Sequence, residues 1–348
     1  MRLLFNIVLF LVYSVTGFAQ QRDFSEWDAT AFCSYTKHHP FTYVKADNNW
    51  EILQTLRTPH TRAYLDSLGI HNTDSQMMLL RIEGLISQDE NKNWISLMPI
   101  LDSLQTVKAR TYSLQVAQTL YPQIKNDIFS LINVLKQEGL QESIYTILFS
   151  YILDGEIWKS LNSYEDLKSA ATWDGECWAL YYPRKFSSGT NGYDNFNLCW
   201  SKHQPEFVWK ELSLKTFIEP FLADYKENGK IISSDIYAKA LALGMINKNG
   251  YLCIPIINSQ NKDSQLNQIS DEIIKVITQY FASSRIVSDF QEEFRINQDN
   301  KKLACTMLYH EVMWDLMDLL INDNIVNIPI LWKDKNLKSM YSVVFIKN

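Results

Sequence analysis

The sequence predicts a mainly α-helical protein with small β elements, an α+β fold, built twice in tandem. Composition supplies the first observation. The 348 residues include only 11 glycines and 9 prolines, about half the share of an average chain, so helix breakers are scarce. Hydrophobic residues make up 46% and aromatic residues 13%, which is too much apolar mass for an intrinsically disordered chain.

The second observation is a set of sequence anchors that recur in the same order, about 160 residues apart. Chance matches would not keep a nearly constant spacing over this many positions. We therefore expect a duplicated unit, with repeat 1 at 20–187 and repeat 2 at 188–348, and a turn-rich boundary between them. The matched anchors are Cys33 with Cys199, Trp50 with Trp209, Pro59 with Pro220, Gly84 with Gly244, Pro99 with Pro255, and Thr146 with Thr306.

Each repeat is expected to open with three short helices and a hairpin. The lead-ins before the helices, Lys37–Pro40 and Lys202–Pro205, are extended because proline disfavours helix in the residue before it. The proline and glycine anchors bound the helices, since proline suits a first helical turn and glycine suits a C-terminal cap. Three helices followed by a hairpin resemble a winged helix, at about residues 48–101 and 207–257.

Longer helices and one strand complete each repeat. Residues 102–137 carry apolar side chains at helical spacing, and Pro122 is expected to kink or break this run. In repeat 2 an apolar stripe over 269–281 has the same period. A very apolar helix follows at 142–153 and 302–321, and a closing strand at 177–182 and 341–346.

The first 19 residues, Met1 to Ala19, have the pattern of a secretory signal peptide. One basic residue precedes an apolar stretch, and small residues precede the expected cleavage site. The apolar stretch is shorter than the ~20 residues of a stable membrane span. We therefore expect an exported protein, located in the periplasm, at the cell surface or outside the cell. An uncleaved N-terminal anchor is the alternative, and no later segment is long and apolar enough to span a membrane.

The charge pattern argues against a nucleic-acid partner. The formal net charge is −6, and no basic run stands out, whereas non-specific nucleic-acid affinity depends on clustered lysine and arginine. The five cysteines permit disulfides in an exported protein, but an odd number leaves at least one thiol outside any internal pair.

A Lys-His-x-Pro element occurs in both repeats, which places His38 and His203 at equivalent positions, each preceded by a lysine, Lys37 or Lys202. If the two histidines face one another, they could bind an anionic ligand or a metal, or act as a general base, because histidine titrates near neutrality. The competing interpretation is a histidine hydrogen-bonded to the backbone at a strand start. Two histidines without further ligands do not predict a metal site, and no cofactor is predicted.

The segment Gly175–Ala179 reads Gly-Glu-Cys-Trp-Ala. It resembles the surroundings of the nucleophile in papain-like and transglutaminase-like cysteine hydrolases. The resemblance implies Cys177 as nucleophile and His203 or His310 as base. In those enzymes a helix starts at the cysteine, whereas the residues after Cys177 predict a strand and a turn. A buried strand cysteine beside Trp178 is the competing interpretation.

The segment that begins at His310 is similar to the HExxH motif of metalloproteases, but the second ligand position holds Trp314, which does not bind zinc. His310 could still join Glu311, Asp315 and Asp318 in a polar patch that carries a site of its own. The competing interpretation is a set of solvated or interhelical hydrogen-bonded groups.

The function that the sequence favours is non-catalytic binding or protein interaction. No nucleotide-binding, phosphate-loop, CxxC or GxSxG pattern is present. The expected ligand is a protein, a peptide or a glycan in a cleft between two pseudo-symmetric repeats. Its candidate contacts are Lys37, His38, Trp178, Trp200, Lys202 and His203. The two tryptophans, if buried, would instead hold the domains together. The alternative function is a hydrolase with a Cys/His or a His-based site. It would use Cys177 with His203 or His310, or the pair of His38 and His203.

Overall fold

The computed structural model describes residues 23–33, 39–162, 175–184, 187–193, 195–201, 214–297, 300–329 and 343–347. These residues form a mixed α+β structure that is mainly helical, with small sheets, which confirms the predicted class. The expected signal peptide and the Lys-His-x-Pro elements, apart from His39 and Pro40, lie outside the described residues. No helix in the described ranges is long and apolar enough to cross a membrane.

The chain packs into two compact units, each assembled from three stretches of sequence. Unit 1 draws on 1–109, 168–184 and 288–307, and unit 2 draws on 110–167, 185–287 and 308–348. These units are groups of packed residues, whereas the ranges 20–187 and 188–348 are sequence repeats. The division into repeats therefore stays a prediction at this point.

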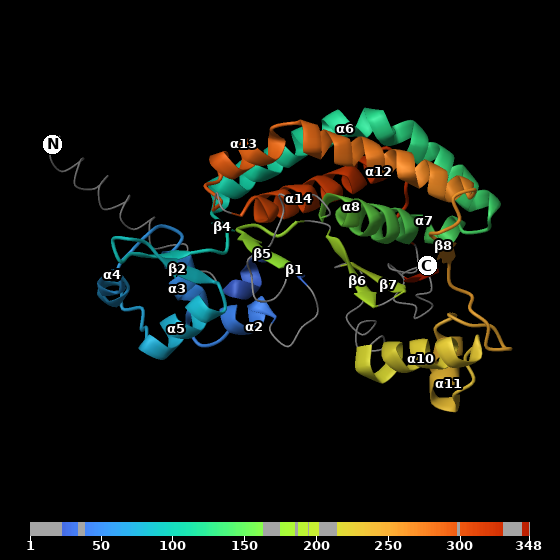
Figure 1. The fold of residues 1–348 in the computed structure, drawn as a ribbon, viewed down its shortest axis with the longest axis horizontal. Coiled ribbons are helices and arrows are strands. Elements are labelled where there is room, and N and C mark those ends of the chain that lie inside the picture. The colour runs from blue at the N-terminus through green and yellow to red at the C-terminus, as the bar shows by residue number, and fades with distance from the viewer. Residues whose placement is uncertain are drawn as a thin grey trace, which may run out of the picture. The chain divides into compact units, whose positions relative to one another are not determined.

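Short helices and a hairpin make up the first part of unit 1 (Figure 1). Local signals explain their starts: Pro40 lies in the first turn of a helix whose cap, His39, accepts a hydrogen bond from the backbone N–H of Phe41. Thr73 and Gln76 form a capping box. The elements are the 3-10 helix η1 (Phe24–Glu26), α2 (Pro40–Val44), α3 (Asn49–Thr55), α4 (Arg62–Ser67), α5 (Asp74–Ile82) and the antiparallel strands β2 (Ile86–Gln88) and β3 (Trp94–Ser96).

A three-stranded sheet completes unit 1. The central strand β5 (Gly175–Leu180) pairs antiparallel with β1 (Asp28–Cys33) and parallel with β4 (Ile100–Leu101). All six residues of β5 are buried. Cys177, Ala179 and Tyr181 belong to the apolar core that also contains Trp50 of α3, as expected where alternate residues of a strand face one side of the sheet.

Unit 2 contains a four-stranded sheet in the order β6-β7-β9-β8. Strand β9 (Val343–Lys347) pairs antiparallel with β7 (Phe196–Ser201) and parallel with β8 (Ile256–Asn258), and β6 (Ser188–Tyr193) pairs antiparallel with β7. The helices η4 (Leu214–Ile218), α10 (Glu219–Asn228) and α11 (Ser234–Ala242) share an apolar core with β7 and β9, centred on residues such as Phe196, Phe221 and Phe345.

Helices of very different lengths make up the rest of the described structure. They are α6 (Ser103–Gln137), α7 (Ile144–Thr146) after the 3-10 turn η2 (Gln141–Ser143), the π-helix η3 (Ile147–Ile157), α8 (Trp158–Asn162), α12 (Gln265–Ser283), α13 (Ile286–Glu293) and α14 (Lys301–Asn322). Pro122 was expected to kink or break this helix. The expectation of a break is wrong, because α6 continues through this residue. Proline removes one backbone hydrogen bond, and the buried side chains of Leu120 and Ile124 on either side favour a continuous helix.

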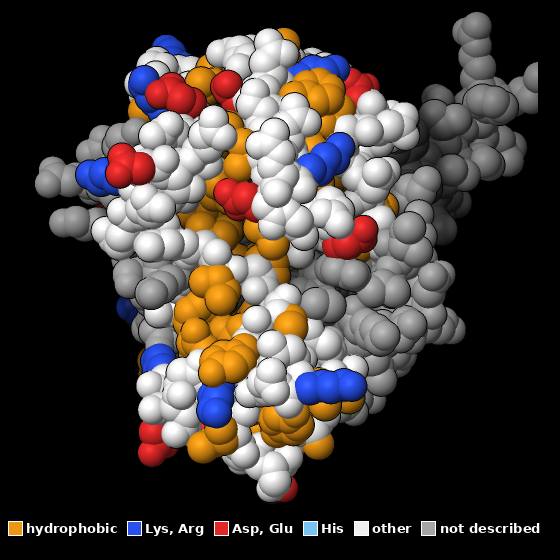
Figure 2. All heavy atoms as spheres, turned by 90° about the vertical axis from the view of Figure 1, so that its right-hand side faces the viewer, with side chains coloured by type: hydrophobic (Ala, Val, Ile, Leu, Met, Phe, Trp, Pro, Cys, Tyr) orange, Lys and Arg blue, Asp and Glu red, His pale blue; other side chains and the backbone are white. Residues whose placement is uncertain are grey.

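Some apolar side chains of unit 2 reach solvent. Ile232, Tyr251 and Ile256 are each about half-exposed. Figure 2 shows hydrophobic side chains at the molecular surface on the face it views. Single exposed apolar residues are normal in folded proteins, so they do not by themselves mark a site.

Candidate functional site

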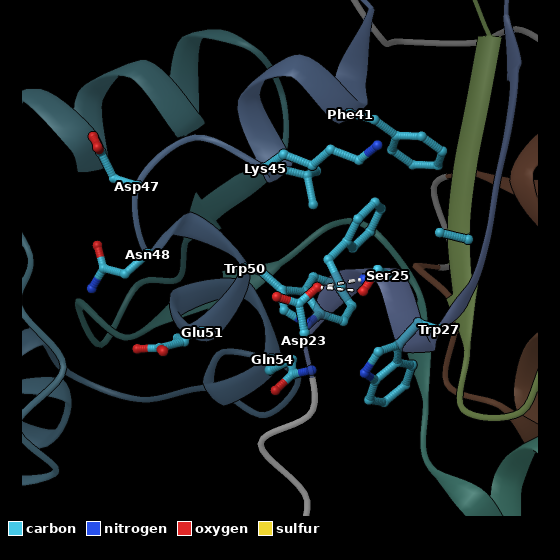
Figure 3. A pocket seen from close by; sticks show the side chains of 13 residues that line it. Asp23, Ser25, Trp27, Phe41, Lys45, Asp47, Asn48, Trp50, Glu51 and Gln54 are labelled. Carbon is cyan, nitrogen blue, oxygen red and sulfur yellow. Dashed lines mark hydrogen bonds between the residues drawn. The ribbon is translucent and has the colours of Figure 1, made fainter.

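A cavity of about 760 Å³ lies in unit 1, against η1, α2 and α3 (Figure 3). This volume falls in the range of small-molecule binding pockets. Its lining combines aromatic rings with charged and amide side chains. The lining residues are Asp23, Phe24, Ser25, Trp27, Ala29, Phe41, Val44, Lys45, Asp47, Asn48, Trp50, Glu51 and Gln54.

Four aromatic rings form one wall of this pocket. The centroid of the Phe24 ring lies 4.9 Å from that of Trp50 and 5.2 Å from that of Phe41, and Trp27 lies 5.2 Å from Trp50, all in edge-to-face geometry. Trp27 and Trp50 are buried, whereas Phe24 and Phe41 are partly exposed. With its amide oxygen turned toward the indoles, Gln54 accepts hydrogen bonds from both indole N–H groups, at 3.1 and 2.7 Å. Phe24 and Phe41 are therefore the more exposed rings of this wall.

Charged groups surround the aromatic wall. Asp23 caps η1, and its Oδ1 accepts hydrogen bonds from the backbone N–H of Ser25 at 2.8 Å and from its hydroxyl at 2.7 Å. The backbone hydrogen bond is the main reason that the pKa of Asp23 is lowered. The ammonium of Lys45 lies 5.3 Å from the centroid of the Phe24 ring. With Asp47 and Glu51, the lining contains three carboxylates and one ammonium.

The turn between α2 and α3 positions the polar side of the pocket. Asp47 adopts a φ of 47°, a left-handed conformation that aspartate tolerates better than most residues. The next residue, Asn48, donates to the backbone carbonyl of His71 at 2.7 Å and accepts from Gln76 at 2.9 Å. Hydrogen bonds to α5 and to the loop before it therefore hold this side of the pocket in place.

Cys177 lies in the middle of β5, opposite Ala31 of β1, and its side chain is buried. Burial, with a smaller contribution from the charge of Glu176, raises the pKa of the thiol well above its usual range. An activated nucleophile has the opposite property, a lowered pKa. Trp178 is completely buried, while Trp200 on β7 is partly exposed. Trp178 was a candidate either for ligand contact or for a buried packing position, and its burial agrees with the packing position.

His310 lies in α14 and is buried in unit 2. Its Nε2 is 3.7 Å from Oδ1 of Asp154 on the π-helix η3, and the rings of Trp158 and Trp314 flank it at centroid distances of 5.9 and 6.0 Å. Burial raises the pKa of Asp154, and the charge of His310 and hydrogen bonds from Thr190 act against this rise. The pair is buried in the interior of unit 2.

The acidic neighbours of His310 bond to α6. Arg110 forms an ion pair with the fully buried Glu311 at 3.4 Å, and the hydroxyl of Ser113 donates to Asp315 at 2.5 Å. Glu311 and Asp315 of α14 therefore form interhelical interactions with α6, as the competing interpretation of this patch expected. Lys37, His38, Lys202 and His203 lie outside the described residues. Among the residues that are described, no group of three or more metal-ligating side chains is present.

The pocket in unit 1 escaped the sequence interpretation. Its aromatic wall comes from Phe24 and Trp27, which follow the expected signal peptide, and from Phe41 and Trp50 of the short helices α2 and α3. The nearest available signal was the density of aromatic and acidic residues over 23–51. No family model, no curated protein and no solved structure matches this chain.

Proposed function

We propose that this protein is a non-catalytic binding protein whose ligand occupies the pocket formed by η1, α2 and α3. The observation that carries the proposal is the composition of the pocket wall: partly exposed Phe24 and Phe41 beside charged groups. Ligand sites in proteins usually combine an apolar, aromatic wall with a few polar groups that orient the ligand. A pocket of this size can hold a short segment of a peptide or protein ligand.

The polar groups of the pocket suit recognition better than catalysis. Ser25 donates its hydroxyl hydrogen to Asp23, so its proton does not pass to a histidine as in a serine nucleophile. His39 borders α2 and uses Nδ1 to accept the hydrogen bond that caps this helix. Neither arrangement provides a nucleophile beside an available base.

The alternative function is a cysteine hydrolase with Cys177 as nucleophile. Its support is the Gly-Glu-Cys-Trp-Ala segment alone. The buried position of the thiol and its raised pKa weigh against it.

We also propose that the chain arose by tandem duplication of a winged-helix-like unit. The strand pairing supports this: β5 pairs antiparallel with β1 and parallel with β4, and β9 pairs antiparallel with β7 and parallel with β8. In addition, α3 to α5 precede the hairpin β2–β3, and α10 and α11 precede the bridge between Ile246 and Leu252.

Export of the protein after cleavage following Ala19 remains part of the proposal, motivated by the N-terminal pattern. N-terminal sequencing of the protein recovered from the periplasm or medium of an expressing bacterium tests it directly. A first residue of Gln20 agrees with the proposal, and an intact Met1 in the cytoplasmic fraction refutes it.

The binding function is tested by screening short acetylated peptides against the folded protein with ¹H–¹⁵N NMR. Peptides that bind should shift the indole resonance of Trp50 or Trp27, and the shifts should disappear in Phe24→Ser. Phe129→Ser is the matched control, because Phe129 is an exposed phenylalanine on α6 outside the pocket. Peptide shifts that persist in Phe24→Ser would place the site elsewhere, and a complete absence of shifts would refute the proposal.

A further inference from the structure

We infer that the pocket recognises an arginine side chain of a partner polypeptide. This inference rests on the proposed binding function and specifies its ligand. It depends on three features of the pocket: a phenylalanine ring already in contact with a cation, a carboxylate beside that ring, and an excess of negative charge.

The first feature is the contact between Lys45 and Phe24. The ammonium lies 5.3 Å above the ring centroid, which is within the distance at which a ring face attracts a cation. Lys45 is exposed and forms no ion pair with any described residue. A ligand cation can therefore take this position on Phe24 while the lysine side chain turns into solvent.

The second feature is the carboxylate of Asp23. Both hydrogen bonds from Ser25 reach Oδ1, so within the described structure Oδ2 accepts none. Figure 3 shows Asp23 and Ser25 among the side chains that surround the cavity. A guanidinium is planar, so it can stack on an aromatic face and present its N–H groups to a carboxylate at the same time. Lysine has no such plane, which is why we infer arginine.

The third feature is charge. Asp23, Asp47 and Glu51 carry three negative charges in the lining, against one positive charge on Lys45. A glycan would gain nothing from this excess. It would also need broad exposed aromatic faces, whereas Trp27 and Trp50 are buried and their N–H groups bond to Gln54. The pocket therefore favours a cationic side chain over a sugar.

The test compares two probes of the same shape: the peptide acetyl-Gly-Arg-Gly-amide and its citrulline analogue, in which a neutral urea replaces the guanidinium. Calorimetry gives both affinities, and the Trp50 indole resonance reports whether each peptide enters the pocket. We expect the arginine peptide to bind at least about fivefold more tightly, from one cation–π contact and one carboxylate contact. Raising the salt concentration should reduce this preference, because the pocket is open to solvent.

Two variants sharpen the comparison. Asp23→Asn keeps a good helix cap but removes the charge, and should bring the arginine affinity close to that of citrulline. Lys45→Met should raise the arginine affinity about two- to fivefold, because the competing cation is removed. The matched controls are Glu90→Gln and Lys248→Met, exposed residues outside the pocket, which should leave both affinities unchanged.

The outcomes separate the inference from the function on which it rests. Equal affinities for the two peptides, with Trp50 shifted by both, refute the arginine inference and leave the binding function in place. Weaker arginine binding by Lys45→Met also refutes the inference. If neither of these two peptides nor any peptide of the screen shifts the Trp50 or Trp27 resonances, the binding function itself is refuted.

Discussion

The reactivity of the cysteines is the prediction that best separates a binding protein from a cysteine hydrolase. The perturbation is a small thiol reagent added to the folded protein at pH 8. Cys253 is exposed and Cys33 is partly exposed, whereas Cys177, Cys199 and Cys305 are buried. Burial raises the pKa of all three buried thiols, to about 12 for Cys305. Because only the thiolate reacts, these thiols should be protected.

The size of the protection follows from the ionised fractions. An ordinary thiol with a pKa of about 8.5 is about one-quarter ionised at pH 8. With a pKa of about 12, Cys305 is ionised in about one molecule in ten thousand at this pH. The ratio corresponds to a labelling rate about two thousand times lower, before the shielding of the sulfur by its neighbours is counted. Burial also raises the pKa of Cys177 well above its usual range, so this thiol should be protected as well.

The assay is timed alkylation followed by digestion and mass spectrometry, with the protein in guanidinium chloride as the reference in which all five thiols react. We expect Cys253 to label first and Cys177 to remain unmodified after Cys253 is complete. Rapid labelling of Cys177 in the folded protein would refute this reasoning. It would mean an accessible, low-pKa thiol, and would make the hydrolase the better description.

Three further predictions concern the folded structure. Trp178→Ala should lower the free energy of unfolding by about 3–5 kcal/mol, because it empties a fully buried site; urea denaturation measures this, and a loss below 1 kcal/mol would contradict it. Gly155→Ala should cost about 1–3 kcal/mol in the same assay, since the new Cβ would lie 2.9 Å from the carbonyl oxygen of Ser150, and an unchanged midpoint would show that the π-helix adjusts freely. Asp323 accepts a hydrogen bond from Lys125 that lowers its pKa, so its stabilising effect is present above pH 3.8 and is lost as the pH falls through the folded-state pKa. Asp323→Asn should therefore lower the melting temperature at pH 7, and the difference from the wild type should shrink as the pH falls below 3.8; a difference that stays constant with pH would refute this.

Local patterns predicted much of the secondary structure. The scarcity of glycine and proline predicts helices. The strand predicted at 177–182 overlaps β5, which the structure places at Gly175–Leu180. Hairpin β2–β3 follows from a polar turn between apolar residues. Each of these features depends on residues close together in the chain, where periodicity and turn chemistry act.

Features made by distant residues could not be predicted in this way. His310 meets Asp154, and Arg110 meets Glu311, across large sequence separations that leave no spacing rule. The pocket also depends on tertiary packing, because Phe24 lines it only when α2 and α3 pack beside η1. The helix α6 passes through Pro122 because burial on both sides outweighs one missing hydrogen bond, a balance that propensity alone does not reveal.

The central position of β5 in its sheet has a consequence for how the protein is made. Strand β1 and strand β4 are synthesised well before β5, and neither pairs directly with the other. The buried Glu176 of β5 in turn accepts a hydrogen bond from Asn300, which is synthesised later still. Closing contacts over such long loops is slow. Unit 1 therefore acquires its complete set of contacts only after most of the chain has been synthesised, and a fragment that stops at residue 187 would leave Glu176 without this partner.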